Sequence, residues 1–399
     1  MSKILVLPGT MWQLPLMKRI KEMGHELFLV NPLWNEGISN FADHFYEADI
    51  FDFEAVLDYC RSNNIDCVMS DECDIATDIV AKYNRAIGAR ALSEELANLF
   101  TNKCMMRDFC LTHNLNPIPF ALCENINDAI SFFLKHGKSI LKPLNSNSSH
   151  GVFTISSIAD IERNFDESSS FSRQSNSVLI EKYIEGTEFT VDGIMTSNGH
   201  KTLAISEKDH YKHNDNIANK LFFSQTSKRF DYTLLRETNN HLLNLTGLPF
   251  GITHVEYKYC DGKYYLIEMA ARGGGNLISA IISPFMSGID VYKELINCCL
   301  NENYETNAEP DIDNDKISVL KFIDMQSSEG VVKQIKGLDY LEFEQCIKSD
   351  KINFGVGDYI HKPESDSVRI GYYIICAKNK REFDKVSSNV EKKLIIDLA

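Results

Sequence analysis

The sequence predicts an α/β protein with several domains, and three features of the chain lead to that prediction. Residues 2–90 alternate between apolar strand patterns and helical patterns. A compact mixture of strands and helices follows over residues 120–183, and strand patterns then dominate residues 187–300. At roughly 100–200 residues per domain, a chain of 399 residues is long enough for two to four domains.

The first part of the chain reads as a parallel sheet with helices on both faces. The strand KILVLPG ends at Gly9, QLPLMKRIKEMGH has helical spacing and a glycine stop, and ELFLVNP is the next strand. The helix DFEAVLDYCRSNNID, the strand CVMS and the helix CDIATDIVAKYNRAIG continue the alternation, which is typical of parallel sheets. The first turn, LPGTMW, holds a single glycine, so a nicotinamide-dinucleotide site has little support.

Beyond this first sheet the pattern changes. Residues 93–115 are predicted to form helices, and further helices are expected near 231–246 and 289–300. The segment NENYETNAEPDIDNDK, residues 301–316, is polar and acidic and is the best linker candidate. The strands ISVLKFID and SVRIGYYIICAK and a charged terminal helix complete the chain.

The composition restricts the class of partner and the compartment. A formal net charge of -15 repels nucleic-acid backbones and anionic lipid, so we expect neither as a partner. The 11 cysteines are scattered, with no CxxC pair and no zinc-ligand spacing, which favours small buried side chains in a reducing compartment. The apolar N-terminal run is too short for a signal peptide, and no stretch approaches the roughly 20 apolar residues of a membrane span. We therefore expect a cytoplasmic protein.

Two glutamates in the segment HVEYKYCDGKYYLIEMAAR suggest a metal site. The segment reads as a β-hairpin that turns at Asp261–Gly262, which allows Glu256 and Glu268 to be cross-strand neighbours. Two carboxylates buried side by side would repel each other, and a divalent cation removes that cost. Mg²⁺ binds a few carboxylates together with phosphate oxygens. Two solvated acids on an amphipathic hairpin would explain the pair equally well.

His254 lies two residues before Glu256, on the same face of the predicted strand. It could orient a carboxylate or line a substrate pocket. A structural histidine whose ring nitrogens are satisfied within the fold is the favoured interpretation.

The segment ARGGGN follows the second glutamate closely. If Glu268 holds a metal, Arg272 can reach a phosphate that the metal also contacts, because a guanidinium forks onto phosphoryl oxygens. Gly273, Gly274 and Gly275 would let backbone approach a ligand and would supply N–H donors. A glycine-rich turn beside a solvated arginine explains each residue singly but does not explain the set.

Two upstream segments hold groups that suit a nucleotide. SILKPLNSNSSHGVFTI places Lys142 at a strand end, before a small polar loop that could lie over a triphosphate. In VLIEKYIEGTEFTVDG, a strand edge at residues 181–184 and a kink at Gly186 expose backbone groups that could pair with a purine, and Glu188 could hold ribose hydroxyls. Read alone, either segment is better explained as ordinary strand and turn.

Taken in this order, the segments resemble the ATP-grasp superfamily of carboxylate–amine ligases over nearly the whole chain. EKYIEGTEFTVDG is similar to the nucleotide hinge of that family, LKPLNSNSSHGV to its lysine and phosphate loop, and HVEYK followed by YLIEMAARGGGN to its metal-binding acids and arginine. The resemblance implies an ATP-grasp fold, which is multidomain and of the α/β and α+β classes. Its parts would be a Rossmann-like parallel α/β domain (1–100), linker helices with a small α+β lid (101–186), a larger α+β catalytic core with an antiparallel sheet and the metal site (187–308), and a C-terminal α+β portion packed on that core (309–399).

The resemblance also implies roles for individual residues. ATP would be contacted by Lys103, Lys142, Ser148, Ser149, Gly151, Glu181, Lys182, Tyr183, Ile184 and Glu188. Within that set the two lysines would meet phosphates or adenine, Glu181 and Ile184 would flank the adenine, and Glu188 would take the ribose. Mg²⁺ or Mn²⁺ would be bound by Glu256 and Glu268, and catalysis would be served by Lys142 and by Arg272, which would steady the acyl phosphate. The substrate would be faced by His254, Lys208, Gly274, Gly275 and Asn276.

Two positions depart from the family pattern. Many relatives carry an asparagine two residues after the second metal acid, where this chain has Ala270. The number of metal ions, one or two, therefore stays open, and Asn276 is a candidate substitute. The phosphate loop is serine-rich, with one glycine at Gly151. Neither departure removes a charge that the basic reaction requires.

The glycine run after the arginine, with a histidine two residues before the first acid, resembles the L-amino acid ligase branch. We therefore expect an ATP-dependent ligase that joins a small carboxylate to an amine, one of them an amino acid. The polar segment 205–225, which contains Lys208, lies where relatives carry substrate-facing loops, and a mobile surface loop would explain it equally well. Three alternatives remain open: a purine- or carbamoyl-phosphate-pathway ligase of the same superfamily, a nucleotide-binding module without turnover, and a nicotinamide dehydrogenase. The number of subunits is also open, a homodimer being one possibility.

Overall fold

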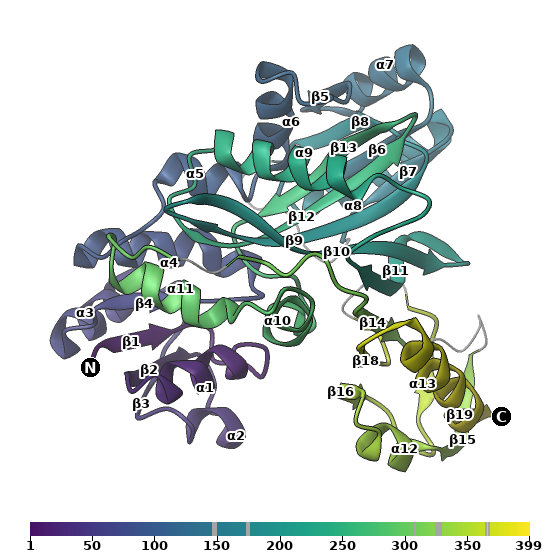
Figure 1. The fold of residues 1–399 in the computed structure, drawn as a ribbon. Helices are drawn as coiled ribbons and strands as arrows, with labels where there is room; N and C mark the ends of the chain where they lie inside the picture. The colour runs from purple at the N-terminus through teal and green to yellow at the C-terminus, as the bar shows by residue number, and fades with distance from the viewer. Residues whose placement is uncertain (146–149, 173–175, 307–308, 324–328, 364, 366–367) are drawn as a thin grey trace.

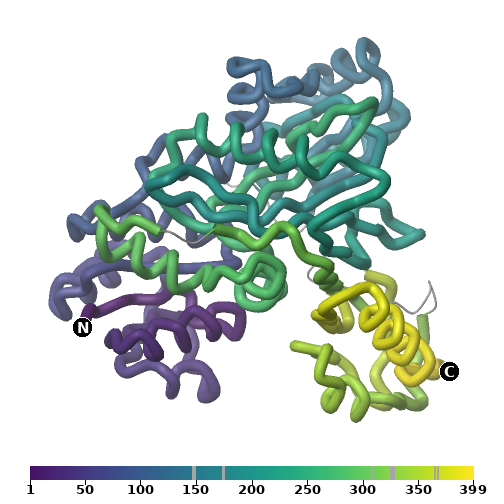
Figure 2. The backbone as a smooth tube through the Cα atoms, viewed as in Figure 1, coloured from purple at the N-terminus to yellow at the C-terminus, as the bar shows by residue number. Residues whose placement is uncertain are grey.

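A computed structural model describes residues 1–145, 150–172, 176–306, 309–323, 329–363, 365 and 368–399. The described residues form four sheets with helices packed against them, which confirms the multidomain α/β class (Figure 1). One sheet is parallel and the other three are antiparallel. The two termini lie on opposite sides of the view in Figure 2. Within the ranges given above, no helix combines the length and apolar character needed to cross a membrane.

The first sheet is built from four parallel strands in the order β3-β2-β1-β4. Its elements, in chain order, are β1 (Lys3–Val6), α1 (Leu14–Glu22), β2 (Glu26–Asn31), α2 (Glu36–Ser39), β3 (His44–Glu47), α3 (Phe53–Asn63), β4 (Cys67–Met69) and α4 (Asp74–Ile87). Alternate residues of the first strand segment enter two separate cores, Ile4 and Val6 on one face and Leu5 and Leu7 on the other. The predicted parallel sheet with two buried faces is therefore confirmed. Because the strand order reverses between β1 and β4, a crevice is expected at their carboxyl ends.

A smaller antiparallel sheet, with the order β5-β8-β6-β7, carries two helices on one face. The elements of this region are α5 (Glu94–Leu99), α6 (Lys103–Thr112), β5 (Phe120–Cys123), α7 (Ile126–His136), β6 (Ser139–Pro143), β7 (Phe153–Ile155), α8 (Ile158–Ser170) and β8 (Val178–Lys182). Phe132 of α7 and Phe165 of α8 share one core with Leu141 of β6. The helices predicted over residues 93–115 are present as α5 and α6.

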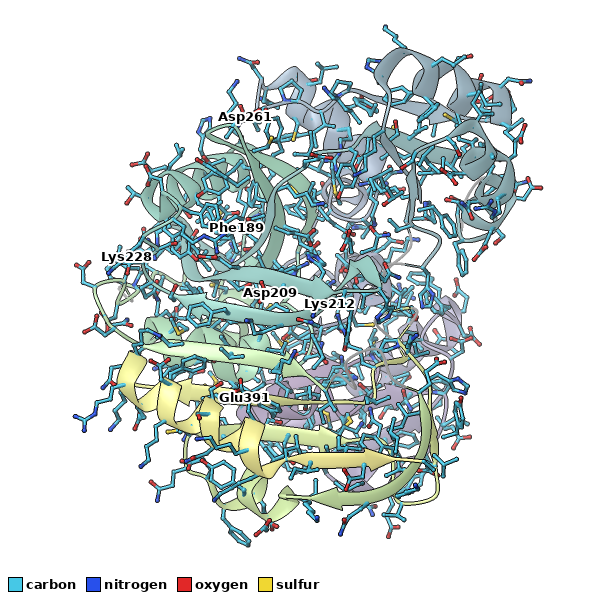
Figure 3. All side chains as sticks on the ribbon, turned by 90° about the vertical axis from the view of Figure 1, so that its right-hand side faces the viewer. Phe189, Asp209, Lys212, Lys228, Asp261 and Glu391 are labelled. Carbon is cyan, nitrogen blue, oxygen red and sulfur yellow. The ribbon has the colours of Figure 1, made fainter. Side chains whose placement is uncertain are left out.

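The largest sheet has eight strands in the order β13-β12-β9-β10-β11-β14-β18-β16. They are β9 (Thr187–Thr196), β10 (Gly199–Tyr211), β11 (Asn214–Ser224), β12 (Gly251–Cys260), β13 (Lys263–Ala270), β14 (Ile317–Phe322), β16 (Ile347–Ile352) and β18 (Gly371–Ala377). Helix α9 (Tyr232–Leu245) packs on it over a core that contains Phe189, which is labelled in Figure 3. Helix α11 (Val291–Leu300) joins the sheet to the N-terminal domain through Tyr292 and Ile296.

The chain beyond α11 extends the same large sheet, because β11 pairs with β14. The described residues of the predicted linker, 301–316, form neither helix nor strand. The expected boundary between residues 308 and 309 therefore lies between strands of one sheet. The remaining elements are η1 (Ile278–Ile282), α10 (Ser283–Ser287), β15 (Gly330–Lys336), α12 (Leu338–Phe343), β17 (Tyr359–Ile360), α13 (Lys380–Lys393) and β19 (Ile395–Leu398).

The prediction that residues 205–225 form a polar loop is wrong. The segment forms the end of β10 and all of β11, which pair in antiparallel register. Leu221 and Phe223 lie two positions apart in β11 and are both buried, so one face of the strand joins the core. Phe222 and Ser224, which alternate with them, are only partly buried. Asp209 and Lys212, both labelled in Figure 3, lie at the turn end of this hairpin.

His200, on β10, is a buried histidine that the fold satisfies on both ring nitrogens. Its Nδ1–H donates to Asn240 Oδ1 at 2.7 Å, and its Nε2 accepts from Thr253 Oγ1 at 2.8 Å. Burial lowers the pKa of His200 to about 4, because the charged ring would lose its hydration.

We predict that the free energy of unfolding declines as the pH falls from about 6.5 towards 4. The unfolded chain binds a proton at the ordinary histidine pKa of 6.5, whereas the folded chain does so only near 4. The stability contributed by neutral His200 is thus complete above pH 6.5 and is lost across this window, by about 3 kcal/mol. Urea denaturation from pH 7 to 4.5 should show a shallower decline for His200→Gln than for the wild type. Equal slopes would contradict the assignment.

Candidate active site

A cavity of about 410 Å³ lies where the small sheet, the large sheet and the N-terminal domain meet. Most of the residues that the sequence singled out line it. These are Lys103, Lys142, Glu181, Lys182, Tyr183, Ile184, Glu188, Lys208, His254, Glu256, Glu268, Arg272, Gly275 and Asn276. The structure therefore brings together residues that are up to 173 positions apart in the chain, from Lys103 to Asn276.

The predicted hairpin is confirmed as β12 and β13, which turn at Asp261 and Gly262. Both turn residues have positive φ, 49° and 78°, as a two-residue turn of type I′ requires. Glu256 and Glu268 are register partners across the two strands. Their side chains therefore leave the sheet on the same face and line the same cavity.

Lys208 joins two carboxylates of the cavity. Its Nζ lies 2.6 Å from Glu256 Oε1 and 2.8 Å from Glu188 Oε1. Although burial opposes ionisation of the acids, the lysine lowers the pKa of Glu188 to about 2 and holds the pKa of Glu256 well below its usual range. The three side chains come from adjacent strands, so the pairing follows from the sheet register.

His254 is both satisfied within the fold and exposed to the cavity. Its Nδ1 lies 2.8 Å from Asp192 Oδ1, and its Nε2 lies 3.5 Å from Glu256 Oε1. Burial favours the neutral ring, but Asp192 and Glu256 outweigh it and raise the pKa of His254 to about 9. The imidazolium is therefore the form present at neutral pH, with Nδ1–H donating to Asp192 and Nε2 within ion-pair distance of Glu256. The favoured structural interpretation accounts for these contacts, and a substrate role stays a prediction.

Glu181 is held between two cations. Lys142 Nζ lies 2.6 Å from Oε1, and Arg107 Nε lies 2.6 Å from Oε2. Arg107 also donates through Nη2 to the carbonyl oxygen of Ile267, at 2.5 Å. Burial lowers the pKa of Lys142 to about 8 despite the acid, while Arg107 and Lys142 overcome the effect of burial and lower the pKa of Glu181 to about 2. Sequence reasoning missed Arg107, which looks like any charged residue within a helix.

Arg272 is held by the N-terminal domain. Its Nε and Nη2 lie 2.6 and 2.7 Å from the two carboxylate oxygens of Asp74, and its Nη1 donates to the carbonyl oxygen of Gly273. Asp74 begins α4, just after β4, and was also missed. The acids of SDECD at the carboxyl end of a predicted parallel strand were the available signal.

Lys103 pairs with Glu268, the second of the two predicted metal ligands. Its Nζ lies 2.7 Å from Glu268 Oε1.

The three glycines after Arg272 have different surroundings. A Cβ on Gly273 would lie 1.7 Å from Ser279 Oγ, and one on Gly274 would lie 2.7 Å from His254 Nδ1, whereas a Cβ on Gly275 would meet nothing within 4 Å. The Gly273 N–H donates to Asp71 Oδ1 at 2.7 Å. Gly273 and Gly274 thus serve close packing inside the protein, and of the three glycines only Gly275 lines the cavity.

The predicted nucleotide hinge follows β8, at residues 183–186, and has a backbone N–H group that a planar base could use. The N–H groups of Lys182 and Tyr183 donate to the carbonyl oxygens of Pro119 and Lys138. Within the described part of the chain, no backbone acceptor takes the Ile184 N–H. The Tyr183 ring is fixed by Lys138 Nζ, 3.8 Å from its centroid, and Lys258 Nζ, 4.7 Å away.

The predicted phosphate loop is only partly described. Ser148 and Ser149 lie outside the described residues. Gly151 has φ of 71°, and a Cβ there would lie 2.8 Å from the Phe171 ring. It lines a separate open cleft between the small sheet and the C-terminal strands, rather than the cavity of the paired acids.

Comparison with known proteins gives a consistent picture. Residues 137–280 match the model of a family described as the ATP-grasp domain. No curated protein sequence matches the chain. Among solved structures, the chain is similar to the L-amino acid ligase from Bacillus licheniformis, with 18% identity and a TM-score of 0.82 over 100% of this chain and 99% of that one.

Two further structures are similar over the whole of this chain. Phosphoribosylglycinamide synthetase from Anaerococcus prevotii has 18% identity and a TM-score of 0.73, with 100% of both chains covered. The biotin carboxylase domain of the Hydrogenobacter thermophilus 2-oxoglutarate carboxylase, solved with MgADP, ADP and bicarbonate, has 15% identity and a TM-score of 0.74, with 100% of this chain and 91% of that one covered.

The domain match and the fold agree. Residues 137–280 match the ATP-grasp domain model, and the chain as a whole has the ATP-grasp fold, as its motifs predicted. In particular, the Bacillus licheniformis L-amino acid ligase has a fold similar to that of this chain from end to end.

We predict that Gly274→Ala destabilises the protein and that Gly275→Ala does not. The new methyl group of the first variant would push against His254 and Asp192, a buried ion pair that cannot yield without losing its contact. Overpacking of this kind costs about 1–3 kcal/mol, whereas a methyl group in open space changes stability by about 0.5 kcal/mol or less. Urea denaturation of both variants measures the difference. Equal losses would show that the loop packing described here is wrong.

Proposed function

We propose that this protein is an ATP-dependent carboxylate–amine ligase that forms an amide or peptide bond, with an amino acid as one substrate, and releases ADP and phosphate. The observation that carries the proposal is the meeting, in one cavity, of the register-paired acids Glu256 and Glu268 with the cations Lys103, Lys142 and Arg272. Anionic oxygens of a nucleotide and carboxylates of the protein can share such a space only when cations separate them. The similar fold of an L-amino acid ligase supports the amino-acid substrate.

The two paired acids fit a magnesium or manganese ion. Both offer hard carboxylate oxygens from one face of a hairpin, and Mg²⁺ is bound by one or two carboxylates together with phosphate oxygens. Such an ion would neutralise phosphate charge during transfer. Ala270 supplies no third ligand on the hairpin, so one ion is the simplest stoichiometry. Asn276, whose φ is 61°, lines the same cavity and is the candidate substitute for the missing ligand.

ATP would lie between the hinge and the paired acids. The Ile184 N–H and the backbone beside Tyr183 suit an adenine edge, and Glu188, one strand further, suits ribose hydroxyls. The phosphates would then face Lys142 and Lys103. Glu181 is already paired on both oxygens, so we assign it to fixing Lys142 and Arg107 rather than to a direct bond with the base.

The reaction follows in two displacements. A carboxylate oxygen of the acid substrate attacks the γ-phosphorus of ATP, the bond to ADP breaks, and an acyl phosphate forms. The nitrogen of the amine then attacks the acyl carbon, phosphate leaves, and the nitrogen loses a proton. Lys142, Lys103 and Arg272 would offset charge on the transferring group and position it, which is where most catalysis of phosphoryl transfer lies. Closure of the small sheet would keep water from the intermediate.

A second candidate is a ligase that acts on a ribonucleotide or on bicarbonate. The similarity to phosphoribosylglycinamide synthetase, at a TM-score of 0.73, favours it. The higher TM-score of 0.82 for the L-amino acid ligase favours the first candidate. We place either enzyme in the cytoplasm, without nucleic-acid or membrane partners, on the basis of the net charge of -15 and the free cysteines.

We predict that ADP release by the wild type requires both a carboxylate and an amine. A screen that crosses amino acids with small carboxylates, followed by mass analysis of the product, measures this requirement. Glu268→Gln should lower the rate about 100-fold or more, because removing one preorganised charge from a transition state has that effect. The variant should remain folded, and Glu95→Gln, at an exposed position of α5, is the matched control. ADP release that needs neither substrate would count against the proposal, as would full activity of Glu268→Gln.

A further inference from the structure

Arg107 is a buried cation that does not itself line the cavity. It lies on α6, one helical turn after Lys103, and is 1% exposed. Its Nη1 is buried and has no hydrogen-bond partner among the residues that the structure describes. A buried ion pair with an unsatisfied donor contributes little to stability, so stability alone does not account for this charge.

The guanidinium of Arg107 joins the small sheet to the large one. Its Nε donates to Glu181 Oε2 on β8 at 2.6 Å, and its Nη2 donates to the carbonyl oxygen of Ile267 on β13 at 2.5 Å. Ile267 directly precedes Glu268, one of the two proposed metal ligands. Arg107 thus fixes the position of Glu181 relative to the strand that carries the metal site.

Glu181 also holds Lys142, the lysine proposed to meet the nucleotide phosphates. Lys142 Nζ lies 2.6 Å from Glu181 Oε1, and the glutamate is only 3% exposed. If Lys142 were the only partner of Glu181, a lysine that turned to a phosphate would leave a buried carboxylate without a counter-charge, which is strongly unfavourable. Arg107 occupies the other carboxylate oxygen and does not depend on Lys142 to stay there.

We propose that Arg107 is a positioning residue that frees Lys142 to bind ATP, because it keeps Glu181 paired when the lysine turns from the acid to a nucleotide phosphate. The assignment rests on the ATP site proposed above. Arg107 acts through Glu181 and touches no ligand itself. A guanidinium suits this role because its fork reaches Glu181 and the Ile267 carbonyl oxygen at once, whereas a lysine is a point charge.

Arg107 also affects the charge of Lys142. Burial lowers the pKa of Lys142 to about 8, Glu181 opposes that effect, and Arg107 and Lys103 add to it. These three side chains, from β8 and α6, are the charged groups of the described residues that act on Lys142. Lys142 therefore attracts phosphate below about pH 8 and loses that attraction above it. Removing the Arg107 charge should raise the pKa of Lys142 and move this loss to higher pH.

The test is the affinity for β,γ-imido-ATP with Mg²⁺, measured by calorimetric titration at pH 7. Arg107→Met should raise Kd about 30-fold or more, the usual effect of removing one partner from a buried charge pair. Arg107→Lys keeps the charge and should stay within about 5-fold of the wild type. The control is Arg381→Met, at an exposed position of α13, which should match the wild type.

A second comparison shows whether Arg107 acts through Glu181. In the Glu181→Gln background Lys142 has no acid to leave, so adding Arg107→Met should change Kd less than about 3-fold. An equal loss in both backgrounds would contradict the proposal. If Arg107→Met alone does not fold, the Glu181→Gln background decides by the same criterion, because it removes the acid that the lost charge would leave unpaired.

The pH dependence gives a readout that loss of packing does not predict. Titrations from pH 7 to 9.5 should show the wild-type affinity falling above about pH 8, and the affinity of Arg107→Met falling only from a higher pH. An onset at the same pH would overturn the role of Arg107, as would a wild-type Kd for Arg107→Met. A wild type that does not bind the nucleotide at all would overturn the proposed function and this assignment with it.

Discussion

Mutual neutralisation of buried charges is the constraint on which the rest of this structure depends. A buried acid is costly when it stands alone, and for five acids of the cavity the fold offsets that cost with a cation from another element: Asp74, Glu181, Glu188, Glu256 and Glu268. Glu181 of β8 ties Lys142 of β6 to Arg107 of α6. Arg272, just after β13, ties the large sheet to Asp74 at the start of α4. Two contacts of the site therefore also join the large sheet to other parts of the fold, the Arg272–Asp74 pair and the hydrogen bond from Arg107 to the Ile267 carbonyl oxygen.

This constraint shapes how a nucleotide could enter. Lys103 and Arg272 are paired with Glu268 and Asp74, so a phosphate that recruits either cation leaves an acid without its partner. Removing one member of a buried pair is strongly destabilising, and a divalent ion that came with the phosphates would restore the balance. The proposed function thus explains why paired acids and several cations occupy one cavity.

Local patterns in the sequence predicted the parts of this site that depend on neighbouring residues. The Asp261–Gly262 turn specified the hairpin, and the strand period then placed Glu256 opposite Glu268. The alternation of strands and helices over residues 2–90 is also a local pattern, and it predicted the parallel sheet. The polar residues of 205–225 predicted a loop, and this prediction is wrong. The buried face of β11 becomes evident only once the strand pairs with β14.

Long-range partners could not be read from the sequence. Arg107 lies 74 positions from Glu181, and Asp74 lies 198 positions from Arg272, so only the packed fold brings them together. The substrate contact of Gly274 stays a prediction, and the structure adds that its lack of a side chain makes room for His254. In each case the contact depends on a neighbour from another element.

The most direct test of this account is the anomalous scattering of manganese in crystals grown with Mn²⁺ and a non-hydrolysable ATP analogue. The account predicts a peak bridging the carboxylates of Glu256 and Glu268 on one side and nucleotide phosphate oxygens on the other. Bound nucleotide with no peak at that position, or with manganese held elsewhere in the chain, would contradict it.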